Sequence, residues 1–293
     1  MEDSQKVVLI TGASSGFGRL IAETLARKKY RVFATMRDVN GRNAEVAQEL
    51  RELAAHESIF LRTLELDVTN QASVERAVGS ALAKCGRIDV LVNNAGYGIM
   101  DLAETVTLAQ AQRQFDTNFF GVLRTNRAVL PIMKRQESGL LLHVSSGAGR
   151  LAIPGLGLYC ASKFAMEALA ETLRYELASQ GIDSVVIEPG AYATAIMDKL
   201  EPGEDPSRKS GYGEMAHAPG KIKAKLRDSR ANPQEIADAV EKIIETPAGQ
   251  RQLRYRVGPG GPGVQRINTL TDEIQGQLLE AFGLTEFAKF KRR

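Results

Sequence analysis

The sequence has few cysteines, no long apolar run and almost no excess of either charge. Cys85 and Cys160 are the two cysteines among 293 residues, too few for a disulfide scaffold and typical of a reducing compartment. No segment reaches the about 18 consecutive apolar residues of a membrane span, and the N-terminus carries no charged-then-apolar leader. We therefore expect a cytoplasmic protein without a membrane span.

The charge balance also argues against a nucleic-acid partner. Lysine and arginine number 38 against 35 acidic residues, which leaves a net charge of +3. A nucleic-acid footprint or a polybasic membrane anchor would need a stronger basic bias. With 43% hydrophobic residues, the chain can bury a large core, and we expect a single dinucleotide-binding catalytic domain over residues 1–293.

A glycine-rich segment follows the first apolar run directly. Residues 6–10 (KVVLI) lead into TGASSGFG at 11–18, after which apolar residues recur at helical spacing. Gly12 permits a tight turn, Gly16 lets backbone approach a pyrophosphate, and Gly18 lets the helix pack close to the strand. The free N–H groups at the helix start then face the anion. This pattern favours a dinucleotide site over a plain turn between strand and helix.

The end of the second apolar run indicates which nicotinamide cofactor is preferred. Folds that bind NAD place an acidic residue there, on the ribose 2′-hydroxyl. Here Met36 occupies the position and Arg37 follows it. A guanidinium can pair with a 2′-phosphate, which a carboxylate would repel, so the sequence favours NADP(H) over NAD(H). The alternative is that Asp38 neutralises Arg37 as a local surface pair.

Strand and helix patterns alternate along the chain. This alternation predicts an α/β fold: a doubly wound, mostly parallel seven-stranded sheet of the Rossmann type, with helices on both faces. The strands are expected at residues 6–10, 31–36, 59–66, 88–92, 140–144, 184–188 and 254–257. Helices are expected, among others, at 41–56, 70–85, 107–136, 232–245 and 267–290.

Tyr159 and Lys163 lie four residues apart where a helical segment begins. On a helix the two side chains share a face, and a nearby ammonium favours the phenolate, so we expect a lowered pKa for Tyr159. Such a tyrosine can act as a general acid or base. The spacing alone also arises by chance, so the assignment depends on the other motifs. Cys160 is expected to pack as a small apolar residue, with oxidation sensitivity as the alternative.

These motifs together resemble the short-chain dehydrogenase/reductase family over about residues 6–258. They are TGxxxGxG at 11–18, NNAG at 93–96, YxxxK at 159–163 and PGxxxT at 189–194. The resemblance implies that Asn118, Ser146, Tyr159 and Lys163 are catalytic. Ser146, thirteen residues before Tyr159, would hold the substrate carbonyl oxygen, and Asn118 would hold a water that links Lys163 to solvent. The alternative for Asn118 is an ordinary polar helix residue.

The resemblance also implies a set of cofactor contacts and no metal. Asp67 and Val68 would line the adenine pocket; Asp67 could instead cap the helix at 70–85, or do both. Pro189, Gly190 and Thr194 would contact the nicotinamide carboxamide. The full predicted cofactor set is Gly12, Ser14, Ser15, Gly16, Phe17, Gly18, Arg37, Asp67, Val68, Asn94, Ala95, Gly96, Tyr159, Lys163, Pro189, Gly190 and Thr194.

Two segments in the last third of the chain differ in composition from the rest. Residues 195–230 interleave glycine and proline with charges, and the resemblance implies a lid over the substrate; a disordered insertion is the alternative. A helical extension at about 264–293 carries an apolar stripe that is either core or an oligomer contact. Apolar residues beside the expected lid favour a hydrophobic substrate: Leu151, Ile153, Leu156, Leu158, Tyr192 and Ile196.

The expected function is an NADP(H)-dependent oxidoreductase that interconverts a hydrophobic ketone or aldehyde and the alcohol, with Tyr159 as general acid/base. The chain also resembles the branch of the family that contains 17β-hydroxysteroid and retinol dehydrogenases, but that match is less specific than the match to the family. The resemblance implies a homodimer or homotetramer. Two alternatives remain: a non-catalytic, dinucleotide-sensing regulatory protein, or an epimerase or lyase with tightly bound cofactor. We do not expect a serine hydrolase, and His143 is expected to make a packing or edge contact.

Overall fold

The computed structural model describes residues 5–193, 199–260 and 262–291. These residues include a seven-stranded sheet in the order β3-β2-β1-β4-β5-β6-β7, and every neighbouring pair of strands is parallel. The predicted Rossmann-type sheet is therefore confirmed, and it is wholly parallel in the described part of the chain. The strands are β1 (Val7–Ile10), β2 (Arg31–Met36), β3 (Leu61–Glu65), β4 (Val90–Asn93), β5 (Gly139–Val144), β6 (Ile182–Pro189) and β7 (Arg254–Val257).

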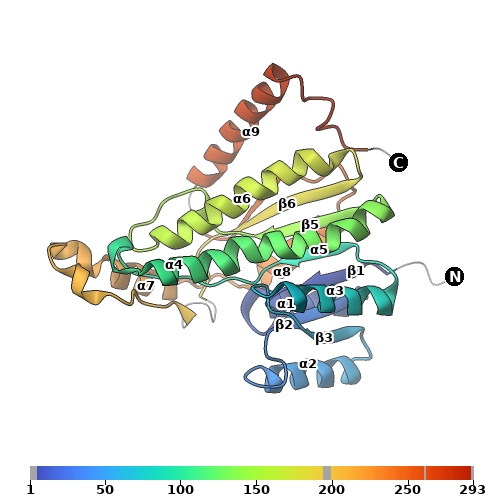
Figure 1. Ribbon diagram of the computed structural model, residues 1–293, viewed down its shortest axis with the longest axis horizontal. Helices are drawn as coiled ribbons and strands as arrows, with labels where there is room; N and C mark the ends of the chain where they lie inside the picture. Colours follow the sequence, from blue (N-terminus) through green and yellow to red (C-terminus); the bar gives the residue numbers. More distant parts are fainter. Residues whose placement is uncertain (1–4, 194–198, 261, 292–293) are drawn as a thin grey trace.

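Helices cover both faces of this sheet (Figure 1). Successive strand side chains point to opposite faces, so Val8 and Ile10 belong to one hydrophobic cluster and Val7 and Leu9 to the other. The first cluster includes residues of α1 (Gly16–Arg27), α2 (Ala44–His56) and α8 (Gln234–Glu245). The second includes residues of α3 (Gln71–Cys85), α5 (Gly121–Gln136) and α6 (Gly157–Ala178). Burial on both faces explains the near-continuous apolar runs of the strands.

The helix expected at 107–136 is divided into three parts. It consists of α4 (Leu108–Phe115), a π-helical segment η2 (Asp116–Phe120) and α5. A π-helical turn inserts an extra residue and redirects the side chains beside it. Asn118 lies inside this segment and is buried. The irregular turn therefore coincides with a residue that the sequence had marked for function.

Other boundaries differ from the prediction by a few residues. The helix expected from 41 begins at Ala44, because Gly41 N and Asn43 N both donate to Asp38 O in a preceding turn. The helix expected at 267–290 is α9 (Gly263–Ala281), and turns follow it to Lys291. None of the described helices is long and apolar enough to cross a membrane.

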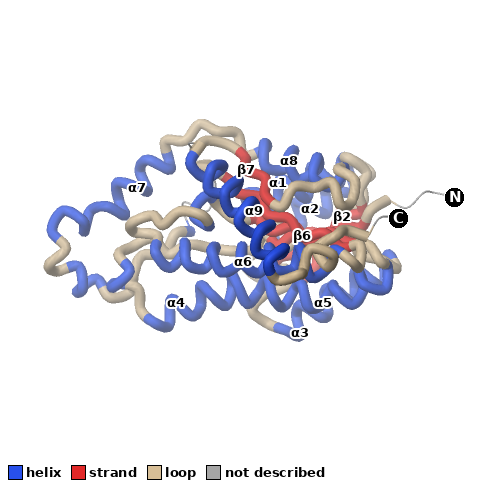
Figure 2. The backbone as a smooth tube through the Cα atoms, turned by 90° about the horizontal axis from the view of Figure 1, so that it is seen from above, coloured by secondary structure: helices blue, strands red, loops and turns tan. Residues whose placement is uncertain are grey.

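The segment from Lys199 to Arg230 projects at one end of the molecule and is largely helical, as Figures 1 and 2 show. Its first part is tied down: Met100 N donates to Glu201 O at 2.9 Å, and Lys209 pairs with Asp101 at 2.9 Å. These contacts hold the first part of the segment, and residues 195–198 lie outside the described residues. The predicted lid stays a prediction. The helices here are η5 (Pro206–Lys209), η6 (Gly213–His217) and α7 (Ala218–Arg227).

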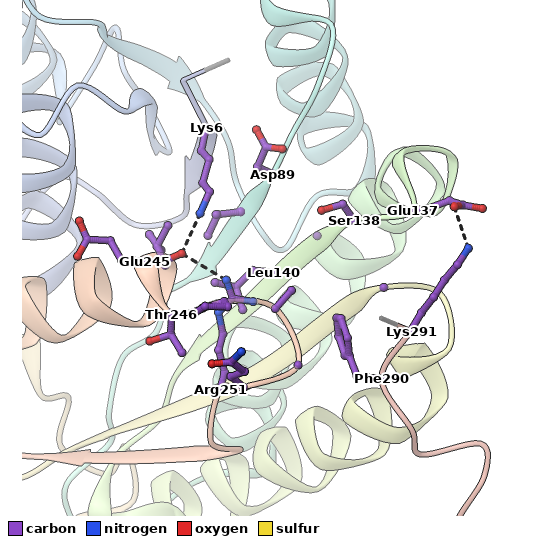
Figure 3. Close-up of a pocket in the computed structure, with 18 of the residues that line it drawn as sticks. Lys6, Asp89, Glu137, Ser138, Leu140, Glu245, Thr246, Arg251, Phe290 and Lys291 are labelled. Carbon is purple, nitrogen blue, oxygen red and sulfur yellow. Dashed lines mark hydrogen bonds and ion pairs between the residues drawn. The ribbon is translucent and has the colours of Figure 1, made fainter. Parts of the chain in front are cut away.

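The C-terminal part of the chain crosses to the amino edge of the sheet. Helix α9 leans away from the body (Figure 1), and the chain then returns until Lys291 N donates to Ala178 O at 3.0 Å. Phe290 and Lys291 there line a cavity of about 1270 Å³, together with Lys6, Asp89 and Arg251 (Figure 3). None of the predicted site residues lines this cavity.

Candidate active site

The predicted cofactor motifs meet at the carboxyl edge of the sheet, between β1 and β4. The strand order reverses there, which is where open α/β sheets form a ligand crevice. Thr11 Oγ1, just after β1, accepts hydrogen bonds from the N–H groups of Asn94 and Ala95, both at 3.0 Å. Asn94 Nδ2 donates in return to Thr11 O at 2.9 Å and to Gly12 O at 3.0 Å. The NNAG segment thus holds the glycine loop in place.

The glycine loop has the geometry that a pyrophosphate needs. Gly12 and Gly16 have positive φ angles of 68° and 57°, and a Cβ on Gly12 would lie 2.8 Å from Ala95 Cα. A Cβ on Gly16 would meet nothing within 4 Å, so that backbone faces open space. The Ser15 side chain does not cap α1, and the first turn of α1 has no acidic residue. The first N–H groups of α1 are thus available to an anion, and the residues present fit a dinucleotide.

Positive side chains gather beside the glycine loop. Arg37 is exposed, and no carboxylate among the described residues forms an ion pair with it. Asp38 instead accepts a hydrogen bond from Arg42 N at 3.0 Å, so the proposed neutralising pair is absent. Lys199 Nζ donates to Ser15 Oγ at 2.7 Å. Burial and the positive charges of Arg42 and Arg37 lower the pKa of Lys199.

The hydrogen bonds around Asp67 exclude its predicted alternative role as the cap of α3. Its carboxylate accepts hydrogen bonds from Thr69 N at 2.9 Å and Thr69 Oγ1 at 2.7 Å. The cap of α3 is Asn70, whose Oδ1 accepts from Ser73 N at 3.0 Å. The alternative that Asp67 caps this helix is therefore wrong. Val68 is buried, and the predicted contact of both residues with an adenine stays a prediction.

Ser146, Tyr159 and Lys163 come together where β5 ends and α6 begins. Lys163 Nζ lies 5.8 Å from the centroid of the Tyr159 ring and donates to Val144 O at 2.8 Å. Ser146 follows two residues after Val144, and its hydroxyl lies near enough to the Tyr159 hydroxyl to lower the pKa of that phenol in part. The two side chains that sequence spacing placed on one helix face thus meet the hydroxyl from the neighbouring strand end.

The protonation of this group differs from the expectation. Burial raises the pKa of Tyr159 to about 12, although the Ser146 hydroxyl lowers it in part. Burial also lowers the pKa of Lys163 to about 8, against the charge of Glu167, which raises it. The predicted lowering of the Tyr159 pKa is therefore wrong for the described residues alone, because desolvation by burial outweighs the effect of Ser146. At neutral pH the phenol keeps its proton, as a donor to a carbonyl oxygen must.

Asn118 uses its side chain to join three segments. Its Nδ2 donates to Tyr97 O at 2.9 Å and to Ser162 Oγ at 3.0 Å, while its Oδ1 accepts from Tyr97 N at 3.1 Å. A Cβ on Gly96 would lie 3.2 Å from Asn118 Oδ1 and 3.7 Å from Lys163 Nζ. Asn118 is thus a buried polar residue whose side chain joins segments that are far apart in the sequence. Its predicted role in holding a water stays a prediction.

The predicted nicotinamide contacts of the segment after β6 stay a prediction. Gly190 N donates to Val257 O at 2.8 Å, so the PG turn is fixed against the end of β7. Thr194 and Ile196 lie outside the described residues. Tyr192 does not face the Tyr159 group: its ring packs on Phe17 at 5.5 Å between centroids, and its hydroxyl donates to Glu235 at 2.8 Å. The expectation that Tyr192 lies near the substrate is wrong.

An apolar cluster adjoins Tyr159 instead. A Cβ on Gly98 would lie 2.7 Å from Leu200 Cδ2 and 3.5 Å from Tyr159 Cδ2, so the 199–230 segment reaches the tyrosine. Cys160 is buried in this cluster, which agrees with its expected packing role. Leu151, by contrast, is exposed. The members of the cluster are Met100, Ala148, Leu156 and Cys160, with Ile153, Tyr159, Leu200, Ile222 and Leu226 packed against them.

Comparison with known proteins gives consistent matches over most of the chain. A family model described as short chain dehydrogenase matches residues 6–205. Retinol dehydrogenase 8 of Bos taurus is 36% identical over 274 residues, which cover 88% of this chain and 85% of that protein. The 17-beta-hydroxysteroid dehydrogenase type 1 of Homo sapiens is 36% identical and covers 86% and 77%. The 3-ketodihydrosphingosine reductase of Bacteroides thetaiotaomicron is 34% identical and covers 87% and 88%.

Solved structures agree with these matches. A short-chain dehydrogenase from Streptomyces avermitilis superposes with a TM-score of 0.76 at 31% identity, covering 98% of this chain and 100% of that chain. An alcohol dehydrogenase from Thermococcus sibiricus, complexed with 5-hydroxy-NADP, has a TM-score of 0.69 at 29% identity and covers 88% and 100%. A Burkholderia phymatum protein in complex with NAD has a TM-score of 0.75 at 25% identity and covers 94% and 96%.

Proposed function

The chain belongs to the short-chain dehydrogenase/reductase family of oxidoreductases that use a nicotinamide dinucleotide, and on that premise we propose that it interconverts a hydrophobic ketone or aldehyde and the alcohol with NADP(H). The observation that carries the proposal is the meeting of Ser146, Tyr159 and Lys163 beside an apolar cluster, at the edge where the glycine loop opens.

The chemistry follows from the positions of these side chains. When bound, a nicotinamide would supply the hydride to the carbonyl carbon in reduction and take it up in oxidation. Ser146 orients the carbonyl oxygen by hydrogen bonding, and Tyr159 gives its proton to that oxygen in reduction and removes it in oxidation. Lys163 holds positive charge beside the phenol, which stabilises the phenolate as the proton leaves. Asn118 keeps the Tyr97 backbone fixed against α6, where Tyr159 and Lys163 lie.

The preference for NADP(H) is supported by the cations beside the glycine loop. Arg37 carries no partner carboxylate among the described residues, and Lys199 reaches Ser15 from the far part of the chain. A 2′-phosphate placed among Arg37, Arg42 and Lys199 would receive charge-assisted hydrogen bonds. NAD lacks this phosphate and gains none of them.

A hydrophobic substrate is supported by the cluster around Tyr159 and by the relatives. Ile153, Leu200, Ile222 and Leu226 pack, as Tyr159 does, against one buried apolar cluster that includes Leu156. The similar proteins named above are described as acting on retinol, a hydroxysteroid and ketodihydrosphingosine, all largely apolar molecules. We assign residues 199–230 as the lid of this site, since Leu200 packs next to Tyr159.

Replacing Tyr159 by phenylalanine tests the proposed chemistry. Tyr159→Phe keeps the ring but removes the transferable proton, so kcat for carbonyl reduction should fall at least about 100-fold. The Kd for NADPH, measured by fluorescence titration, should stay within about twofold because the ring still fills its place. Tyr175→Phe, on the same helix α6, is the matched control and should keep its rate.

The outcome of this experiment also separates the alternatives. A Tyr159→Phe variant that retains most of its rate would contradict the proposal. A wild-type protein that binds NADPH yet reduces none of a broad carbonyl panel is a regulatory sensor. A protein that converts a substrate without net NADPH consumption is an epimerase or lyase.

Arg37 offers a separate test of cofactor preference. Arg37→Ala should weaken NADPH binding about tenfold or more, because a charge-assisted hydrogen bond is worth roughly 1.5 kcal/mol or more, and should leave NADH binding unchanged. Arg76→Ala, an exposed arginine on α3, serves as control. Equal loss for both cofactors, or tighter binding of NADH by the wild type, would overturn the assignment of NADP(H).

We also propose a homodimer or homotetramer. Two exposed apolar surfaces support it: Leu108 and Phe120 lie on α4 and η2, and Leu270 and Ile274 lie on α9. Light scattering of the purified protein tests this proposal, and a monomer at micromolar concentration would contradict it. The expected cytoplasmic location stays a prediction.

A further inference from the structure

A cluster of charged side chains is buried directly behind Ser146. Ser145 Oγ donates a short hydrogen bond to Glu167 Oε1, and Glu167 is only 1% exposed. Glu188 on β6 is fully buried, and Arg254 on β7 is 6% exposed. A buried charge is costly unless it is paired, so such a cluster needs a reason. The proposed proton transfer uses none of these four residues.

Two successive turns of α6 hold the end of β5. Lys163 Nζ donates to Val144 O, and Glu167, one turn later on the same face, accepts from Ser145 Oγ. Ser145 N also donates to Ile187 O at 2.8 Å. Ser146 is the next residue, so its backbone leaves a segment that is fixed from both the helix and the neighbouring strand.

The turn after Ser146 is shaped around the same carboxylate. A Cβ on Gly149 would collide with Glu167 Oε1 and lie 2.6 Å from Ser145 Oγ. Ala148 N donates to Ser146 Oγ at 3.2 Å within that turn. Glu167 thus contacts the chain on both sides of Ser146, through Ser145 before it and beside Gly149 after it.

The rest of the cluster ties Glu167 to the C-terminal part of the chain. Arg254 Nε lies 3.7 Å from Glu167 Oε2 and 3.8 Å from Glu188 Oε1. From α9, Asn268 Nδ2 donates to Glu188 Oε2 at 2.7 Å, and Asp272 accepts from Arg254 Nη1 at 2.8 Å. Helix α9 therefore supplies hydrogen-bond partners to Glu188 and Arg254 in addition to the contacts from the sheet and α6.

Charge around Glu167 comes from several elements. Burial and the neighbouring Glu188 raise the pKa of Glu167 to about 7. Above that pH its negative charge raises the pKa of Lys163. The charged groups of the cluster are Lys163 and Glu171 on α6, Glu188 on β6, Arg254 on β7, Arg150 after the turn at 147–149, and Asp272 on α9.

We propose that Glu167 is a positioning residue, which directs the Ser146 hydroxyl toward Tyr159 through Ser145 and keeps Lys163 protonated through its charge. Glu167 touches neither substrate nor cofactor in this scheme. The proposal deepens the function proposed above and rests on it. The buried cluster and α9 serve to hold the Glu167 carboxylate in place.

Three variants and a control test this role. Glu167→Ala should lower kcat at least about tenfold with the Kd for NADPH within about twofold. Glu167→Gln keeps an oxygen that accepts from Ser145, so it should recover most of that rate. Ser145→Ala removes the hydrogen bond but leaves the charge, so kcat should fall while the pH profile stays. Glu176→Gln, an exposed glutamate on α6, should behave as wild type.

The pH profile separates positioning from mere structural support. Glu167→Gln removes a negative charge near Lys163, so the apparent pKa of the alcohol-oxidation rate should move about 0.5 unit or more to lower pH. The pH dependence of NADPH binding, followed by fluorescence, should shift in the same direction without any turnover. Equal loss of rate in Glu167→Ala and Glu167→Gln, or pH profiles that do not move, would overturn the proposal.

The two proposals fail in different ways. If the wild type reduces no carbonyl, the proposed function is wrong, while the shift in pH-dependent NADPH binding still decides the role of Glu167. If Glu167→Ala does not fold, Ser145→Ala and Glu167→Gln carry the test, since each alters one of the two contributions.

Discussion

His143 is a buried histidine with both ring nitrogens in contact with polar partners. Its Nδ1 lies 3.3 Å from Asn93 Nδ2, and its Nε2 lies 3.2 Å from Ser184 Oγ, which donates to Ala170 O. An amide can only donate to Nδ1, so Nε2 carries the proton and the ring is neutral. His143 lies on β5 between β4 and β6, which makes it a packing residue, as one of the two expectations had it, and not an edge contact.

This histidine predicts a loss of stability in acid. Burial and the nearby Lys163 lower the pKa of His143 to about 3. Between pH 6.5 and pH 3 the unfolded chain therefore binds a proton that the native state excludes, so the free energy of unfolding falls as the pH falls. His143→Gln has no such titrating group, so its stability does not fall for this reason in acid. The amount by which its free energy of unfolding in urea lies below that of wild type should decrease by about 2 kcal/mol from pH 7 to pH 5. A deficit that stays constant would contradict the neutral buried ring.

Residues of the site differ in how well the sequence could predict them. Ser146, Tyr159 and Lys163 were identifiable because their spacing along one helix and one strand end is local. Lys199 was missed because it reaches Ser15 across 184 positions of sequence. Glu167 carried an available signal, a carboxylate one turn after Lys163 on the same helix face. The Tyr159 pKa was mispredicted because spacing shows neighbouring charges but not burial.

At the scale of elements, the turn from β1 into α1 depends on close packing at Gly18. A Cβ there would collide with Asn94 Nδ2 and approach Gly12 O. Asn94 bridges Thr11 and Gly12, so Gly18→Ala should weaken NADPH binding at least about tenfold and cost roughly 1–3 kcal/mol of stability through overpacking. Fluorescence titration and urea unfolding measure the two effects.

Gly79 is the matched control for this prediction. It lies inside α3, and a Cβ there would meet nothing within 4 Å. Gly79→Ala should therefore stabilise the protein by about 0.5–1 kcal/mol and leave NADPH affinity unchanged. If Gly18→Ala behaves like Gly79→Ala, the close approach of α1 to the NNAG segment is not required for binding.

Element boundaries were hardest to predict where tertiary contacts decide them. The π-helical segment at Asp116–Phe120 interrupts a sequence that reads as one helix. Hydrogen bonds from Asn118 to Tyr97 and Ser162 accompany this turn, and they join residues far apart in sequence. Hydrophobic periodicity contains no record of such bonds, so it predicts a continuous helix.

At the scale of the whole molecule, the sheet was predictable and the contacts that hold residues 199–230 were not. Repeated alternation of apolar runs and amphipathic stretches leaves few topologies other than a parallel sheet between helices. The 199–230 segment, in contrast, is held by Asp101, which pairs with Lys209 and accepts from Gly203 N at 3.1 Å. Such contacts connect this segment to a distant part of the chain. Composition alone indicates only that the segment is rich in glycine, proline and charged residues.

The placement of the chain ends has a practical consequence. Lys6 and Lys291 line the same cavity at the amino edge of the sheet (Figure 3), and the Tyr159 group lies at the carboxyl edge. A linker attached at Lys6 or Lys291 would therefore sit on the side away from the Tyr159 group. On the proposed function, immobilisation on a bead or electrode through either lysine would leave the carboxyl edge of the sheet facing the solution.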